Sequence, residues 1–220
     1  MIHLLYTSFT SPLEEQTYVN YVSTLPESMK EKNSRYIRWQ DKHAHLFGKL
    51  LLLKGLQMFT YDNEVLKEIC YNEYNRPFLN DGIDFNISHS AQYVVCAIAK
   101  DLKLGIDIEE VRKMEFEDFK ETMTEEQWKC VKSANNSPKE FFKYWTIKES
   151  VIKADSRGLS IPLTSIHVIG NIANCEDKLW HIQEVKLDKN YCCYLACNRE
   201  DVRVNIQRID FCSGFKAESL

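Results

Sequence analysis

The chain has 220 residues, of which 44% are hydrophobic and 27% are charged, a balance typical of a folded globular protein and not of a disordered one. This length suffices for one sizeable domain or for two small halves that each bury a core. The net charge of −4 and the pI of about 5.9 argue against nucleic-acid binding as the main role, although a local basic cluster could still hold an acidic substrate.

The N-terminus and the cysteines indicate the compartment. The first residues carry no basic leader, and the longest aliphatic run, Leu50 to Leu53, is far too short for a membrane span. We therefore expect neither a signal peptide nor a membrane segment. The eight cysteines, at positions 70, 96, 130, 175, 192, 193, 197 and 212, form no C-x-x-C pair, so we expect reduced thiols in a cytoplasmic protein.

The first quarter of the chain is expected to contain a strand and two helices. Residues 2–6 form a short strand, and Ser11, with Pro next to it and Glu14 three residues on, predicts a capped helix that ends near residue 23. A long helix is predicted over residues 34–58, because apolar residues recur there at helical spacing. The basic segment 29–43 fits either a solvated helix face or the rim of a phosphate pocket.

The middle of the chain is predicted to form strands. Residues 71–77 have the composition of a turn, and residues 83–88 and 93–99 are expected to pair as a hairpin. Residues 102–109 form the next strand. The region from 115 to 132 then turns helical.

The second half is expected to combine helices with an antiparallel sheet. Thr124 begins a capping box, and Ser137 opens the strongest helix of this half, which ends near Ala154. Four strands are predicted after it, over residues 165–169, 179–187, 191–197 and 202–209. Because helices and strands do not alternate strictly, the predicted class is α+β.

The strand around residue 107 is the first candidate site. Apolar and acidic residues alternate there, which puts Asp107 and Glu109 on one face and Ile106 and Ile108 on the other, toward a core. An ordinary edge strand with a solvated acidic face has the same pattern. Two carboxylates on one rigid face also suit Mg²⁺, which takes oxygen ligands.

The helix that begins at Ser137 supplies a second candidate. Its spacing places Phe142, Trp145, Glu149 and Ile152 on one face, with Lys153 beside them. The simple alternative is a surface ion pair between Glu149 and Lys153, which would stabilise the helix by only a few tenths of a kcal/mol. If the stripe faces the core, the glutamate could be a third oxygen ligand, and the lysine could hold the anion that the metal also binds.

The segment Asn86-Ile87-Ser88-His89-Ser90 supplies the third candidate. A histidine between hydroxyls at a strand end can donate to an oxyanion or carry a proton, although most such histidines are simply polar turn residues. A nucleophilic pair of Ser88 with His89 is disfavoured, because adjacent residues of a strand point to opposite faces.

Together these blocks resemble a known family. FNISHS at 85–90, GIDIE at 105–109 and F-x-x-x-W-x-x-K-E-S-x-x-K at 141–153 match, in order, the motifs of 4′-phosphopantetheinyl transferases of the surfactin-synthetase-activating type. The continuation GLSIPL at 158–163 fits the same type. The resemblance runs from about residue 26 to residue 165.

The resemblance implies a fold and an activity. It implies two similar α+β halves, residues 1–101 and 102–220, packed as a pseudo-dimer in a monomeric protein, with coenzyme A in the cleft between them. Such enzymes move the 4′-phosphopantetheine arm of coenzyme A to a serine of an apo acyl or peptidyl carrier protein and release adenosine 3′,5′-bisphosphate. Neither nucleic acid nor membrane is an implied partner. Which carrier protein is used stays open.

The resemblance also implies roles for single residues. Asp107, Glu109 and Glu149 would bind Mg²⁺, and Glu149 would also be the base for the carrier serine. Two departures from the family pattern are Asn75 and Ser156, which stand where glycine is common. The implied contacts to coenzyme A are those of Lys30, Lys32, Arg76, Ser88, His89 and Lys153.

Two other functions fit parts of the same pattern. A metal-dependent phosphohydrolase or nuclease could use an Asp-x-Glu pair with a distant glutamate and lysine. The acidic net charge disfavours a nucleic-acid substrate, and FNISHS is not required by that class. A non-catalytic binding module for coenzyme A or a carrier protein is the second alternative, and the complete set of three acidic residues argues against it.

Overall fold

The computed structural model describes residues 1–211. The elements up to residue 103 are β1 (Ile2–Ser8), α1 (Glu15–Ser23), α2 (Glu27–Ser34), α3 (Trp39–Gln57), η1 (Val65–Glu68), β2 (Cys70–Tyr71), β3 (Pro77–Phe78), β4 (Ile83–Ser90) and β5 (Tyr93–Lys100). The following elements are β6 (Leu104–Glu110), η2 (Phe116–Thr122), α4 (Glu125–Ser133), α5 (Ser137–Asp155), η3 (Gly158–Ser160), η4 (Leu163–Ser165), β7 (Ile166–Ile169), β8 (Ile172–Cys175), β9 (Lys178–Glu184), β10 (Tyr191–Cys197) and β11 (Val204–Arg208).

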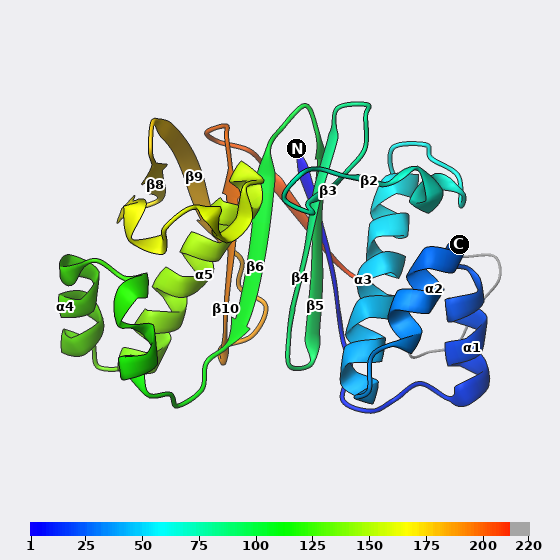
Figure 1. Ribbon diagram of the computed structural model, residues 1–220, viewed down its shortest axis with the longest axis horizontal. Helices are drawn as coiled ribbons and strands as arrows, with labels where there is room; N and C mark the ends of the chain where they lie inside the picture. The colour runs from blue at the N-terminus through cyan, green and yellow to red at the C-terminus, as the bar shows by residue number, and fades with distance from the viewer. Residues whose placement is uncertain (212–220) are drawn as a thin grey trace.

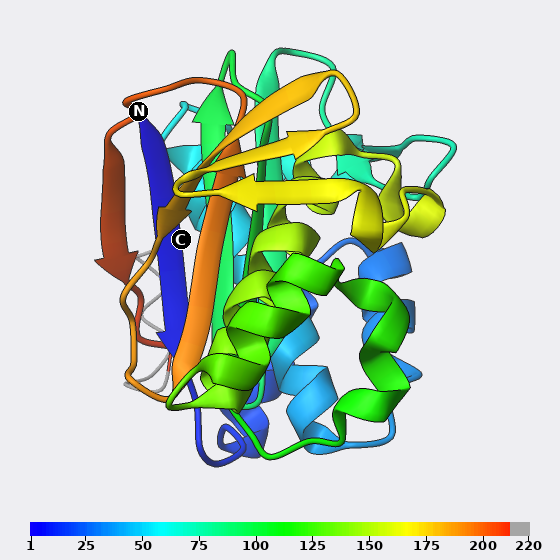
Figure 2. The same cartoon turned by 90° about the vertical axis from the view of Figure 1, so that its left-hand side faces the viewer.

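Two sheets form the centre of the molecule, and one long helix packs on each, which confirms the α+β class. The first sheet has the order β11-β1-β5-β4 and is covered by α3; the second has the order β6-β10-β9-β8-β7 and is covered by α5. Figure 1 shows α3 with α1 and α2 on one flank and α5 with α4 on the other. Figure 2 looks at α5 in front of the second sheet.

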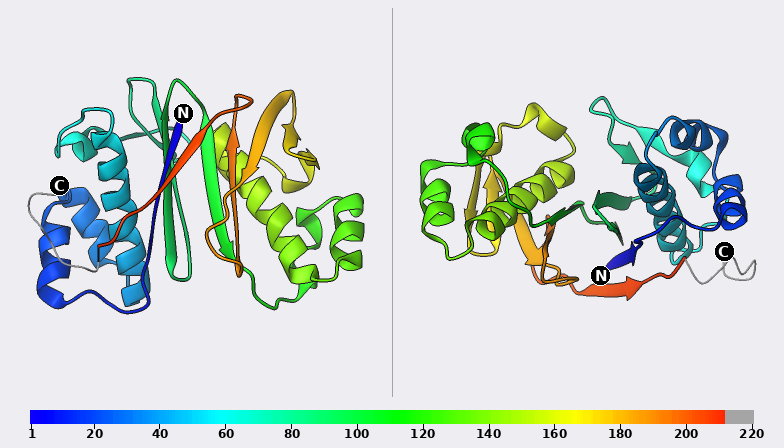
Figure 3. Two further views of the ribbon diagram at one scale, coloured as in Figure 1. Left: turned by 180° about the vertical axis from the view of Figure 1, so that it is seen from behind. Right: turned by 90° about the horizontal axis from the view of Figure 1, so that it is seen from below.

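The last strand belongs to a different sheet from the one predicted from the sequence. Residues 202–209 were predicted to join an antiparallel C-terminal sheet, but β11 pairs in parallel with β1, from Ile2 opposite Val204 to Tyr6 opposite Arg208. Figure 3 shows β11 beside β1 when the molecule is seen from behind. The chain therefore returns to its first sheet, a non-local pairing that strand periodicity does not encode.

The helix boundaries in the first half differ from the prediction. The capped helix predicted from Ser11 begins only at Glu15, and no side chain caps it. The predicted helix 34–58 begins only at Trp39, because the backbone is extended at Arg38, and a separate helix, α2, ends at Ser34 before it. The apolar stripe starts only within α3, and Ile37 in the break is 96% exposed, so nothing holds that segment helical against the core.

The second half follows the prediction more closely. Thr124 forms the expected capping box with Gln127, whereas α5 is capped by Asn136, whose Oδ1 accepts from the Lys139 N–H at 3.0 Å, and not by Ser137. Strand β8 was not predicted. The described cysteines are free thiols, and Cys212 lies outside the described residues.

The packing of the two halves brings β4 and β6 side by side. Each is an outer strand of its own sheet, and they share no backbone ladder. Ile106 and Ile108 are fully buried, as the alternation predicted. None of the helices in residues 1–211 combines the length and apolar character that a bilayer span requires.

Candidate active site

Asp107 lies at the centre of the candidate site and is not a solvated surface residue. It is 4% exposed, and its Oδ1 accepts from Lys153 Nζ at 2.6 Å and from Ser88 Oγ at 2.8 Å. The lysine reaches it from α5 and also donates to the Ile106 carbonyl at 3.3 Å. The other oxygen, Oδ2, is buried and has no hydrogen-bond partner among the described residues. A buried carboxylate oxygen without a partner is costly and suits a cation ligand.

Glu109 and Glu149 complete an acidic group with Asp107. Burial raises the pKa of Glu109, and the Asp107 charge raises it further. Burial also raises the pKa of Glu149, to which both Asp107 and Glu109 add. Glu109 Oε2 accepts from Ser90 Oγ at 2.9 Å. The fold thus brings together, from β6 and α5, the three carboxylates that the sequence singled out, and their mutual repulsion favours a shared cation.

Gly105 explains how α5 approaches β6 closely enough for this arrangement. A Cβ at this position would lie 2.1 Å from the Ser150 carbonyl oxygen and 2.4 Å from the Ala154 nitrogen. These atoms are helix backbone and cannot swing aside as a side chain can. Only glycine permits the contact, and the contact places Glu149 and Lys153 against the acidic strand.

The carboxylate oxygens of Asp107, Glu109 and Glu149 are ligands of the kind that a hard divalent cation binds. Oxygen ligands from carboxylates are those that Mg²⁺ takes, usually one or two from protein with water and phosphate completing the shell. Within the described residues, no group of three or more His, Cys, Asp or Glu side chains has metal-site geometry as it stands. Asp107 Oδ1 is already bonded to the Lys153 ammonium, so the unpartnered Oδ2 is the oxygen that remains for a metal.

His89 lies at the rim of the site. Its side chain is exposed, and its pKa is lowered by partial desolvation and then by Lys153, against the opposing charges of Asp41 and Asp107. The imidazole is therefore neutral near pH 7 and can donate one N–H or accept a proton. A cavity of about 610 Å³ opens beside it, and Arg38, Trp39, Asp41, Ser90 and Arg112 are among its lining residues.

A second cationic group lies on α2 and α3. Burial, together with the charges of Lys49, Lys32 and His89, lowers the pKa of His45 to about 4. Burial also lowers the pKa of Lys49, with a further contribution from Lys32. His45 Nε2 is buried without a partner among the described residues. Lys32 thus lowers the pKa of both other groups, and an anion bound between the three side chains would offset that repulsion.

Two members of this group were not predicted from the sequence, and one predicted residue lies elsewhere. His45 and Lys49 are four residues apart on α3, a spacing that puts them on one face and could have identified them. Lys32 was predicted, and the structure places it with them. Lys30 instead pairs with Glu27 at 3.4 Å and lines a different cavity, next to Leu25.

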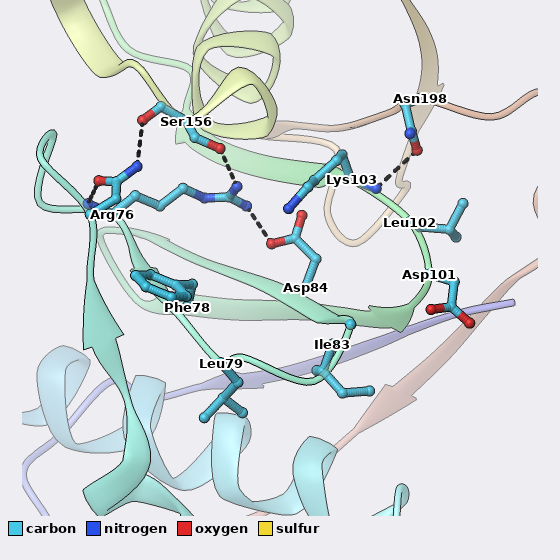
Figure 4. Close-up of a pocket in the computed structure, with 12 residues that line it drawn as sticks. Arg76, Phe78, Leu79, Ile83, Asp84, Asp101, Leu102, Lys103, Ser156 and Asn198 are labelled. Carbon is cyan, nitrogen blue, oxygen red and sulfur yellow. Dashed lines mark hydrogen bonds and ion pairs between the residues drawn. The ribbon is translucent and has the colours of Figure 1, made fainter.

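Arg76 connects the two sheets, through β4 and β6, instead of presenting a free cation. Its guanidinium pairs with Asp84 at 2.9 Å, donates to Ser156 Oγ at 2.6 Å and donates to the Leu104 carbonyl at 2.9 Å. Figure 4 shows the contacts with Asp84 and Ser156 at the edge of a cavity of about 480 Å³. The residues that replace family glycines, Asn75 and Ser156, adopt positive φ angles of 60° and 82°. The Ser156 hydroxyl accepts the arginine bond that glycine could not.

Comparison with known proteins adds an independent finding. Residues 103–196 match the model of the 4′-phosphopantetheinyl transferase superfamily, and residues 11–101 match that of the N-terminal region of 4′-phosphopantetheinyl transferases. The chain is 33% identical over 174 residues to 4′-phosphopantetheinyl transferase gsp of Aneurinibacillus migulanus, covering 78% of this chain and 73% of that one. It is 30% identical over 162 residues to 4′-phosphopantetheinyl transferase Sfp of Bacillus subtilis, covering 71% of each. A Xenopus laevis L-aminoadipate-semialdehyde dehydrogenase-phosphopantetheinyl transferase is 27% identical over 207 residues, covering 78% of this chain and 68% of that one.

Proposed function

The chain belongs to the 4′-phosphopantetheinyl transferase superfamily, and we propose that it moves the 4′-phosphopantetheine arm of coenzyme A to a serine of an apo carrier protein. The reaction forms a bond between the serine Oγ and the phosphorus that carries pantetheine. The bond from that phosphorus to the bridging oxygen breaks, and adenosine 3′,5′-bisphosphate leaves with the bridging oxygen. The serine proton passes to a base of the enzyme.

The observation that carries the proposal is the acidic group beside Lys153. Asp107, Glu109 and Glu149 would hold Mg²⁺, and the unpartnered Asp107 Oδ2 supports this assignment. When bound, the ion would neutralise the pyrophosphate of coenzyme A. Lys153, held 2.6 Å from Asp107, supplies a fixed ammonium for a phosphate oxygen. Phosphoryl transfer depends on such positioning and charge neutralisation more than on covalent work by the protein.

Glu149 is the proposed base. A general base works best when its pKa lies nearer the working pH than that of an ordinary carboxyl, and burial with two acidic neighbours raises the pKa of Glu149. His89 would add a donor to the phosphate oxygens, whereas the predicted contact of Ser88 is not kept, because its hydroxyl already donates to Asp107 Oδ1. His89 is neutral near pH 7 because its pKa is lowered, so it would act as an N–H donor and not as a fixed charge.

The cationic group on α2 and α3 is the proposed site for the 3′-phosphate of coenzyme A. The charge of Lys32 lowers the pKa of both His45 and Lys49, and a phosphate dianion bound there would offset that repulsion. We leave Lys30 out of this site because it pairs with Glu27 on a different surface. We also leave out Arg76, because Asp84 already neutralises it.

The remaining assignments concern arrangement and setting. We propose two halves, residues 1–101 and 102–220, that form a pseudo-dimer in one monomeric chain and hold coenzyme A between them; the separate family matches to 11–101 and 103–196 support that division. β11 is the exception, since it belongs to the first sheet. The free thiols of residues 1–211 support a reducing, cytoplasmic setting.

One experiment tests the activity directly. The protein is incubated with an apo carrier protein, coenzyme A and Mg²⁺, and the carrier is weighed by mass spectrometry beside a reaction with an established transferase. The expected result is a gain of one phosphopantetheine, which disappears when the carrier serine is replaced by alanine. An unmodified carrier in a reaction where the reference enzyme works would refute the proposal. Cleaved coenzyme A with an unmodified carrier would instead indicate a phosphohydrolase.

A further inference from the structure

Strand β6 is attached to β4 by side chains in place of a backbone ladder. The N–H groups of Leu104, Ile106, Ile108 and Glu110 all point to the β4 edge and donate to side-chain oxygens of that strand. Their acceptors are, in order, Asp84 Oδ2 at 2.9 Å, Asn86 Oδ1 at 2.9 Å, Ser88 Oγ at 3.4 Å and Ser90 Oγ at 3.0 Å.

The regularity of these four bonds defines the geometry of the junction. Each joins residues exactly twenty apart, so β4 and β6 run in parallel and in register. The Asp and Asn acceptors lie at the end of the junction near Arg76, and the two serines lie at the end that carries Asp107 and Glu109.

The two serine positions also hold the carboxylates themselves. Ser90 Oγ accepts from the Glu110 N–H and donates to Glu109 Oε2 at 2.9 Å. Ser88 Oγ accepts from the Ile108 N–H and donates to Asp107 Oδ1 at 2.8 Å. A hydroxyl has one donor and two acceptor positions, so each serine can fix a strand amide and a carboxylate at once.

The same junction keeps backbone carbonyls of β6 available to cations. In a parallel ladder, the carbonyls on this edge would accept from the neighbouring strand. Here the Leu104 carbonyl accepts from Arg76, and the Ile106 carbonyl accepts from Lys153. The ammonium beside Asp107 is thus anchored by an atom that a continuous sheet would have used.

We propose that the four alternating polar side chains of β4 act as positioning residues that set the place of β6, and with it the directions of Asp107 and Glu109. Asn86 and Ser90 are the informative members, because Asn86 touches neither carboxylate and Ser90 touches only Glu109. The expected effect on kcat rests on the proposed transferase function. The expected effect on the position of β6 rests on the hydrogen bonds alone.

The test compares Asn86→Ala, Ser90→Ala and the conservative variant Ser90→Thr, which keeps the hydroxyl. Asn205→Ala, an exposed asparagine on β11, is the matched control. Carrier modification gives kcat and the KM for coenzyme A. Binding of Mn²⁺, used as the probe for the cation, is measured by titration in the absence of substrates. Amide hydrogen exchange reports the protection of Ile106 and Glu110.

For the two alanine variants we expect kcat to fall 10- to 100-fold and the Mn²⁺ dissociation constant to rise about 10-fold, the usual cost of losing a partner that orients a metal ligand. The KM for coenzyme A should change less than threefold, and Ser90→Thr should recover most of the loss. Exchange should accelerate at Ile106 in Asn86→Ala and at Glu110 in Ser90→Ala. If an alanine variant does not fold, Ser90→Thr and the wild-type exchange pattern still test the proposal. The proposal requires that the amides of Ile106 and Glu110 exchange slowly in the wild type.

Folded alanine variants with wild-type kcat and Mn²⁺ affinity would overturn the proposal, and so would a loss of thermal stability alone. Exposed, rapidly exchanging amides at Ile106 and Glu110 in the wild type would overturn it as well. Failure of the transferase function is distinguishable. In that case the wild type would not modify a carrier, yet the Mn²⁺ and exchange effects would still appear.

Discussion

Lys153 Nζ and Asp107 Oδ1 lie 2.6 Å apart, an ion pair between helix α5 and strand β6 in which the carboxylate side chain is 5% exposed and the lysine side chain 26%. The pair leaves the second carboxylate oxygen buried and without a partner among the described residues. A buried ion pair is weak evidence for stability, because desolvation offsets most of the attraction. Its position between two further acids points to function instead.

Replacing Asp107 by Asn should abolish turnover while the protein still folds. Asn keeps an oxygen for Lys153 but removes the charge that the cation needs, so we expect more than a 100-fold loss of kcat and a loss of stability of about 1–3 kcal/mol. Carrier modification and thermal unfolding measure the two effects. Asp177→Asn, at an exposed turn position, is the control. Activity retained at saturating Mg²⁺ would remove Asp107 from the metal site.

Replacing Glu149 by Gln should stabilise the metal-free protein at pH 8. The pKa of this carboxyl is raised in the folded state, so the charged form is penalised above that pKa and not below it. The stability advantage of the variant should shrink as the pH falls through the raised pKa and vanish near pH 4. Thermal unfolding in a chelator from pH 4 to pH 8 measures it, with Glu121→Gln, an exposed position, as the control. A stability difference between Glu149→Gln and the wild type that does not change with pH would show that the raised pKa of Glu149 is not its cause.

The same pKa predicts how the rate depends on pH. Glu149 must be deprotonated to accept the serine proton, so kcat should rise with pH through its raised pKa in the enzyme–substrate complex. Added Mg²⁺ should shift that rise to lower pH, because a bound cation favours the charged carboxylate. The measurement is kcat against pH at two Mg²⁺ concentrations. An unchanged midpoint would argue that the base lies away from the metal.

Lys32→Ala should weaken the binding of coenzyme A, whereas Lys30→Ala should not. Lys32 interacts with His45 and Lys49, while Lys30 pairs with Glu27 on another surface. We expect a rise of about 10-fold in the KM for coenzyme A, corresponding to about 1.4 kcal/mol for one charge-assisted contact. Dephospho-coenzyme A, which lacks the 3′-phosphate, should show no such difference between wild type and Lys32→Ala. Equal effects of the two lysines would contradict the proposed phosphate site.

Gly105→Ala should destabilise the fold and reduce activity together. The added Cβ would lie 2.1 Å from the Ser150 carbonyl oxygen, so α5 must move away from β6. We expect a cost of about 3 kcal/mol, which for a chain of this size lowers Tm by roughly 6–12 °C. Gly170→Ala, at a positive φ with open space around it, should cost only about 1 kcal/mol. Similar values for the two variants would show that close helix–strand contact is not the reason for Gly105.

Much of the local structure could be predicted because it depends on neighbours in the chain. The alternation around Asp107 identified β6 and its buried face, and the spacing of Glu149 and Lys153 identified one face of α5. Asn75, which stands where glycine is common in the family, has a φ of 60°, a left-handed conformation that asparagine tolerates better than most residues. The caps predicted at Ser11 and Ser137 were wrong. No side chain caps α1, and Asn136 caps α5.

The sequence by itself determined the family, the α+β class and the acidic and basic residue types of the site, because those follow from motif spacing and local periodicity. Only the tertiary structure decided which cations face the site. It turned Arg76 inward to Asp84, placed Lys30 against Glu27 and gathered His45 and Lys49 with Lys32. It also joined β4 to β6 through side chains. These outcomes depend on contacts between distant segments, whose packing selects one partner among several that the local sequence leaves equally available.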